Sequence, residues 1–170
     1  MKSNNWNTWR SYLEELIEPQ SIDTSNLLSK KSLPEELWTE NQQLKPEILQ
    51  AALNIAEEYF EGLKLDPNIR IEDIILTGSL ASYNWSDMSD FDLHILIDFN
   101  KLNDRNLLED YLRQKSRIWN ITHKILFKGF EVEVYVQDTN EPHYSAGEYS
   151  LMQNRWLKRP QRSKINVDYE

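Results

Sequence analysis

Two acidic residues, Asp90 and Asp92, lie where they could hold a divalent cation. They begin a stretch, 90–97, whose residues 91, 93, 95 and 97 are apolar and whose residues 90, 92 and 94 are polar. Such alternation is typical of a strand with one buried face, so both carboxylates project from the same side. Bringing like charges together is costly unless a cation neutralises them, and hard divalent cations prefer oxygen ligands. The spacing therefore predicts that Asp90 and Asp92 share a metal ion.

A third carboxylate is expected from a second alternating stretch, 130–137, in which Glu131 and Glu133 share the polar face. Glu133 lies in the middle of the expected strand, whereas Glu131 lies beside the turn at Gly129, so the position of Glu133 is better fixed. We predict Glu133 as the third metal ligand and keep Glu131 as the fallback. Carboxylates from two neighbouring strands could hold a pair of metal ions that stabilise the attacking and leaving oxygens together.

A phosphate-binding bend is expected at Gly78-Ser79, where an apolar strand ends. Glycine lets the backbone approach a phosphate closely, and the Ser79 hydroxyl can donate a hydrogen bond to it. Ser82, shortly after the bend, is a further candidate for phosphate binding. If the next turn is helical, its free N–H groups would favour an anion there. The polar loop then returns to Asp90, which makes the phosphate and metal sites neighbours.

Helices and strands must alternate to position these residues. Apolar residues at helical spacing predict a helix that begins at Pro46 and reaches about residue 63, and a second helix capped by Asn103. The second helix is expected to bury Leu107, Leu108, Tyr111, Leu112, Ile118 and Trp119. Buried strands are expected over 69–77 and 91–97, followed by a hairpin over 124–137 that turns at Lys128-Gly129. This order predicts an α/β (α+β) domain, a mixed β-sheet with helices on its apolar face.

Three regions divide the chain in this interpretation: an N-terminal helical extension (1–45), a core (46–140) and a C-terminal segment (141–170). The extension is expected to contain a short helix with Trp9, Leu13, Leu16 and Ile17 on its apolar face. The last twenty residues hold five basic and two acidic residues, a net charge of +3. From Leu157 onward we expect a mobile basic tail.

Composition excludes several classes of protein. The chain has 170 residues, no cysteine and a net charge of −9, with 39% hydrophobic residues. There is no apolar run long enough to cross a bilayer and no secretory leader, so we expect a cytoplasmic protein without membrane partners. Extended nonspecific DNA binding is not expected, because it normally requires a basic surface. An acidic protein can still bind a nucleotide if metal cations lie between its carboxylates and the phosphates.

The combination of Gly78-Ser79, ten intervening residues and Asp90-Phe91-Asp92-Leu93 resembles the signature of the polymerase-β-like nucleotidyltransferase superfamily. The stretches 75–79 and 89–95 are similar to its minimal, single-domain members. Together with the stretch 132–136, they also resemble a nucleotidyltransferase-like group encoded by tailed phages, which would act in the host cytoplasm. The resemblance covers about residues 46–140.

This resemblance implies that Mg²⁺ or Mn²⁺ promotes transfer of a nucleotidyl group from a nucleoside triphosphate such as ATP to a hydroxyl, with release of pyrophosphate. Asp90, Asp92 and Glu133 would then be the catalytic metal ligands. The acceptor stays open; the acidic balance favours a protein or a small molecule over RNA. One departure concerns the triphosphate, since many minimal members have an arginine soon after Gly-Ser and this chain has only uncharged residues over 80–86.

Simpler interpretations remain for each signal. The acidic residues could form a solvated sheet face, and the fold could serve as an inactive nucleotide- or metal-binding module or as a phage accessory interaction protein. Tyr83 and Trp85 could stack on a base, although packing within the protein is favoured. His94 shares the face of Asp92 and is expected to be hydrogen-bonded rather than a metal ligand.

Overall fold

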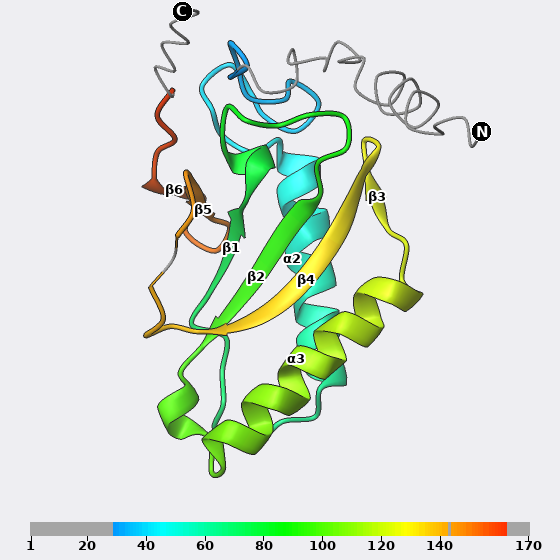
Figure 1. Cartoon of the computed structure of the whole chain (residues 1–170), viewed down its shortest axis with the longest axis vertical. Coiled ribbons are helices and arrows are strands. Elements are labelled where there is room, and N and C mark those ends of the chain that lie inside the picture. Colours follow the sequence, from blue (N-terminus) through cyan, green and yellow to red (C-terminus); the bar gives the residue numbers. More distant parts are fainter. Residues whose placement is uncertain (1–28, 143, 163–170) are drawn as a thin grey trace, which may run out of the picture.

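The computed structural model of the chain describes residues 29–142 and 144–162. Within them, the strands form one mixed sheet in the order β3-β4-β2-β1-β5-β6 (Figure 1). The strands are β1 (Asp73–Thr77), β2 (Phe91–Ile97), β3 (Leu126–Phe127), β4 (Phe130–Asp138), β5 (Glu148–Ser150) and β6 (Arg155–Lys158). The predicted α+β class with a mixed sheet is confirmed: β2 pairs with β1 antiparallel and with β4 parallel.

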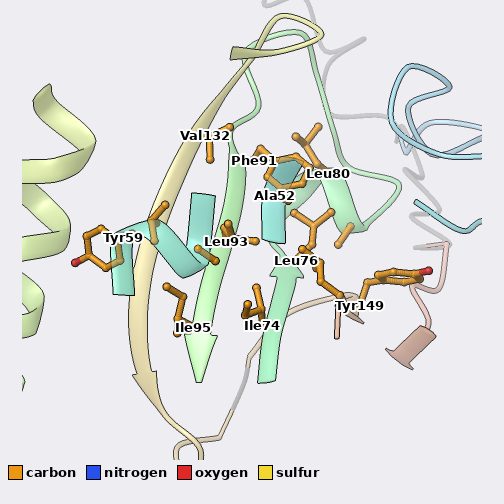
Figure 2. Close-up of a cluster of buried hydrophobic side chains, with 14 of the residues drawn as sticks. Ala52, Tyr59, Ile74, Leu76, Leu80, Phe91, Leu93, Ile95, Val132 and Tyr149 are labelled. Carbon is orange, nitrogen blue, oxygen red and sulfur yellow. The ribbon is translucent and has the colours of Figure 1, made fainter. Parts of the chain in front are cut away.

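One face of the sheet is apolar and is covered by α2 (Pro46–Gly62). Alternation places Ile74, Leu76, Leu93, Ile95 and Val132 on this face, where all are buried (Figure 2). The helix contributes small residues, Ala52 and Ala56, at the contact, and both are fully buried. Small side chains let the helix approach the strands closely, so the larger strand residues fill the space between them. The opposite face of the sheet is thereby left for polar residues.

The predicted buried side of the second helix, α3 (Arg105–Thr122), is wrong in part. Its buried residues are Leu112, Ser116 and Asn120, whereas Leu107 and Ile118 are 67% and 57% exposed. The N-cap residue is Asp104, not Asn103. Figure 1 shows α3 beside β4 rather than across the apolar face.

The edge of β4 explains why α3 buries polar side chains. Apart from its short pairing with β3, this edge of β4 has no strand partner among the described residues. The Asn120 side chain takes that role, since its Oδ1 accepts from the Val134 N–H at 2.9 Å and its Nδ2 donates to the Val134 carbonyl at 3.3 Å. Buried backbone groups need such partners. The need to pair the backbone of β4, rather than the spacing of apolar residues in α3, therefore decides which side of the helix is buried.

Both ends of the described chain belong to the same core. Trp156 of β6 stacks on Trp38 with ring centroids 4.7 Å apart and donates a hydrogen bond to the Gln42 carbonyl. Leu157 lies in β6, so the expectation of a mobile tail from Leu157 is wrong for residues 157 and 158. The helix expected around Trp9 and the residues from 163 onward lie outside the described residues. Neither α2 nor α3 is long and apolar enough to cross a membrane.

Replacing Asn120 with alanine should destabilise the fold, because it leaves the buried backbone N–H and carbonyl of Val134 without partners. We expect the free energy of unfolding to fall by about 2 kcal/mol in urea titrations. Asn106→Ala is the matched control, since Asn106 is exposed on the same helix, and should change the value by less than about 0.5 kcal/mol. Equal effects of the two substitutions would contradict the edge role of Asn120.

Candidate functional site

The polar face of the sheet brings the predicted acidic residues together. Antiparallel pairing places Thr77 opposite Asp92, and parallel pairing places Asp92 beside Glu133. Residues paired across neighbouring strands project to the same face, so these three side chains form one row across β1, β2 and β4. Asp90 lies directly before β2, at the same end of the sheet. The structure thus gathers the carboxylates at 90, 92 and 133.

The Gly78 bend lies against the Asp92 carboxylate. Gly78 has φ +73°, and a Cβ added to it would lie 2.0 Å from Oδ2 of Asp92. Only glycine permits both this conformation and this contact. The predicted bend and the acidic row are therefore in direct contact.

The turn after Gly78 differs from a full helix. Ser79–Ala81 forms a single 3₁₀ turn whose Leu80 and Ala81 are buried in the core. The Gly78 N–H already donates to the Ser145 hydroxyl at 3.3 Å. Ser82 is also engaged, because its hydroxyl donates to the Ser79 carbonyl and accepts from the Asn84 N–H. Ser79 is thus the hydroxyl best placed to meet a phosphate, while Ser82 shapes the bend.

Burial and like charge make the ionised form of Asp92 unfavourable. Burial is the main cause, and the nearby carboxylates of Glu133 and Asp90 add to it, so the pKa of Asp92 rises to about 7. The pKa of Asp90 is raised as well, first by burial and then by Glu133 and Glu131, with Lys124 opposing the shift. Burial and neighbouring carboxylates thus outweigh the effect of Lys124 at Asp90, and no lysine or arginine among the described residues offsets them at Asp92.

Tyr135 holds the carboxylate of Glu133. Its hydroxyl donates a hydrogen bond to Oε2 of Glu133. Burial, together with this hydrogen bond, raises the pKa of the Tyr135 hydroxyl, which stays a donor at neutral pH. Tyr135 follows Glu133 by two residues in the alternating stretch 130–137, so the pattern places both side chains on one face but predicts no role for Tyr135. The contact fixes the direction of Glu133 along β4.

Glu131, the fallback ligand, is occupied elsewhere. It accepts a charge-assisted hydrogen bond from the Lys124 ammonium, across the hairpin. A carboxylate already paired with a lysine has less to gain from a metal ion. Glu133 has no lysine or arginine partner among the described residues, which makes it the better ligand of the two.

The polar face carries two hollows that meet at His94, Tyr135 and Gln137. The first, the Gly78 hollow, has a volume of about 660 Å³ and is lined by Gly78, Ser79, Asp92 and residues 142 and 144–146. The second, the α3 hollow, has about 650 Å³ and is lined by Glu133 and by residues of α3. Asp92 and Glu133 are thus neighbours that open into different hollows.

Other candidates for the site have structural roles. Nδ1 of His94 bonds to the Gln137 side-chain oxygen at 2.8 Å, as expected for a hydrogen-bonded histidine. The indole N–H of Trp85 donates to the Ser32 carbonyl, and the hydroxyl of Tyr83 accepts from Gln42. Neither aromatic residue lines the two hollows. Both aromatic side chains therefore pack within the protein and are not placed to stack on a base.

Ser145 was not anticipated from the sequence. It accepts from the Gly78 N–H and lines the Gly78 hollow. It comes from a loop far along the chain, where no periodic pattern indicates its position.

A metal site made by protein side chains alone is not preformed. Within residues 29–142 and 144–162, no group of three or more His, Asp and Glu side chains is arranged so that it could hold a metal ion. The carboxylates are close enough to influence one another's ionisation, but Glu133 is directed toward Tyr135.

Comparison with known proteins shows a distant similarity to an enzyme that acts on tRNA, by its name. The chain is 28% identical over 121 residues to a tRNA(Ile)-lysidine synthase from Pseudomonas putida strain KT2440. The match covers 67% of this chain, but the chain spans only 28% of the length of that relative. No protein-family model and no solved structure matches the chain.

Replacing Gly78 with alanine should destabilise the protein, because the added methyl group overlaps Asp92 in a left-handed backbone conformation. We expect a loss of about 2–4 kcal/mol in the free energy of unfolding, measured by urea denaturation. Gly129→Ala isolates the backbone strain, since Gly129 has φ +100° in open space, and should cost about 1 kcal/mol. Gly62→Ala, without either feature, should be nearly neutral. If the losses at 78 and 129 are equal, the contact with Asp92 is absent.

Replacing Asp92 with asparagine should stabilise the metal-free protein. The raised pKa means that ionisation of Asp92 destabilises the fold. The loss grows as the pH rises from about 4 and is complete above about pH 7, whereas below about pH 4 the side chain is protonated in both states. Because asparagine is neutral, we expect a gain of about 1–3 kcal/mol at pH 8, measured by thermal unfolding in EDTA, that disappears near pH 4. Asp87→Asn, in the exposed loop, is the control. A gain that does not depend on pH would contradict the electrostatic cause.

Proposed function

We propose that this protein is a metal-dependent nucleotidyltransferase, which transfers a nucleotidyl group from a nucleoside triphosphate such as ATP to a hydroxyl acceptor. The observation that carries the proposal is the pairing of Asp92 with Glu133 on adjacent strands, directly against the Gly78 bend. A chain gains nothing in stability from such a cluster of like charges, so a ligand-binding role explains it best. The resemblance of the motif to the polymerase-β-like superfamily points the same way.

The residues at the site fit a divalent cation. Asp90, Asp92 and Glu133 lie close to one another, and the ionised form of Asp92 lacks a compensating positive charge. Mg²⁺ is usually held by one or two carboxylates together with substrate phosphates, so a complete protein cage is not required. Bound there, Mg²⁺ or Mn²⁺ would neutralise the phosphates and lower the pKa of the acceptor hydroxyl.

The two hollows suggest where each substrate binds. The triphosphate would lie in the Gly78 hollow, with Ser79 donating to a phosphate oxygen, and the acceptor would lie in the α3 hollow beside Glu133. Each volume is in the range of ordinary small-molecule sites. The acceptor oxygen forms a bond to the α-phosphorus, the bond from that phosphorus to the bridging oxygen breaks, pyrophosphate leaves and the hydroxyl proton is released to solvent. Tyr135 keeps Glu133 directed along the face between the two substrates.

The nature of the acceptor rests on size and charge. A small molecule or a protein side chain suits the α3 hollow and the net charge of −9 better than RNA does. The name of the distant relative includes a tRNA, so tRNA belongs among the acceptors to be tested. The reaction needs nucleoside triphosphates, which places it in a cytoplasm, including that of a phage-infected cell.

A second candidate function is nucleotide binding without turnover. The hydrogen bond between Tyr135 and Glu133 favours it, because it occupies one of the two carboxylate oxygens that Glu133 could offer to a metal ion. Nucleotide binding without pyrophosphate release, across a broad range of acceptors, would support this alternative.

Incubation with α-labelled nucleoside triphosphates, Mg²⁺ and host lysate tests the proposal. The wild-type chain should label an acceptor and release pyrophosphate, and Asp92→Asn should lower the rate by at least about 100-fold. The variant should remain folded, by circular dichroism, because it removes an unfavourable charge. Asp110→Asn, an exposed change on α3, is the control. Full activity of Asp92→Asn would refute the assigned role.

A further inference from the structure

The hollows of the polar face differ in their positive charge. The Gly78 hollow has no lysine or arginine in its lining. In the α3 hollow, Arg113 and Arg117 project from successive turns of α3. Among the described residues, no other arginine and no lysine lines either hollow. Among the lining residues, positive charge is therefore found in the α3 hollow, which Glu133 also lines.

The two arginines are in different states. Nη2 of Arg113 bonds to Oε1 of Glu109 at 2.9 Å, so its charge is already compensated within the helix. Arg117 has no ion pair or hydrogen bond to any residue in 29–142 or 144–162, although it lines the same hollow. Nearby Ser116 and Asn120 are buried and directed to Tyr59 and Val134. Arg117 is thus a fixed-charge donor that is left available to a ligand.

We propose that Arg117 binds an anionic group of the acceptor, so that the α3 hollow selects small hydroxyl compounds carrying a phosphate or carboxylate. This inference rests on the proposed function for the identity of the ligand as an acceptor. A guanidinium offers paired donors that match a phosphate or a carboxylate, and its charge does not titrate in the physiological range. The hydroxyl of the same molecule would then lie toward Glu133.

The acidic residues of the α3 hollow do not oppose this assignment. Glu109 is paired with Arg113, and Glu133 accepts a hydrogen bond from Tyr135 and would hold a metal ion in the proposed function. Glu141 also lines the hollow, and would disfavour an acceptor whose anionic group lay on its side. The charges therefore favour one orientation, with the anionic group at Arg117.

A size argument favours a small acceptor over RNA. The α3 hollow has a volume of about 650 Å³, which is sufficient for a sugar phosphate or a nucleotide-sized compound. RNA binding would require a wider basic surface, because most of its affinity comes from neutralising several phosphates. The acceptor experiment below distinguishes a small anionic acceptor from RNA.

Inorganic phosphate is a probe that does not depend on turnover. Titration of the ¹⁵N-labelled full chain should shift the side-chain Nε–H of Arg117 and the amides of Ser116 and Asn120. Arg117→Gln should weaken phosphate binding at these positions about tenfold, and Arg117→Lys less. Lys115→Gln, on a neighbouring part of α3 outside this hollow, should leave it unchanged. Shifts confined to the Gly78 bend would overturn the proposal.

Matched acceptor pairs provide the second readout. With nucleoside triphosphate and Mg²⁺, the wild-type chain should label glycerol 3-phosphate and ribose 5-phosphate more than glycerol and ribose, and Arg117→Gln should remove this preference by raising KM for the phosphorylated acceptor. An increase in KM for the triphosphate instead would overturn the inference, as would preferential labelling of tRNA. Phosphate binding at Arg117 without any transfer would refute the proposed function and leave the anion site intact. Transfer that is insensitive to Arg117→Gln would refute the anion site and leave the proposed function intact.

Discussion

The parallel pairing of β2 with β4 is the constraint on which the site depends. Its register places Asp92 beside Glu133, and the antiparallel pairing of β1 brings Thr77 and the Gly78 bend to the same row. Shifting either strand by one residue would turn the acidic side chains into the apolar core. The buried alternation of Phe91, Leu93 and Val132 prevents that shift. Packing of the core therefore holds the carboxylates close together despite their mutual repulsion.

The elements around the sheet follow from this arrangement. Helix α2 covers the apolar face, so the acidic face stays open, and α3 completes the bare edge of β4 through Asn120. The position of α3 has a chemical consequence, because it directs Arg113 and Arg117 over the polar face beside Glu133. Helix α3 thus carries both Asn120, which supports the strand edge, and the arginines that could contact a substrate.

Electrostatics distinguishes this face from a solvated acidic surface. On a solvated surface, carboxylates would keep their usual pKa, whereas burial and neighbouring charge raise the pKa of Asp92 to about 7. Glu131 is paired with Lys124, and the Tyr135 hydroxyl donates a hydrogen bond to Glu133. The remaining negative charge at Asp90 and Asp92 is what a cation would stabilise. This is the physical basis for preferring a nucleotide-binding role to a structural one.

Periodicity in the sequence determined strands β2 and β4 and the polar face that Asp92, Glu133 and Tyr135 share, because a period of two assigns every side chain to one face. It also predicted the hairpin turn at Gly129, where a positive φ requires glycine. The tertiary structure alone decided which strands are neighbours, which side of α3 is buried, and that β6 continues the sheet. It also placed Ser145 at the Gly78 bend and Arg117 in the hollow that Glu133 lines. All of these features depend on contacts between segments that are distant in the sequence. Strand edges and buried polar groups must find partners there, and no local sequence pattern specifies those partners.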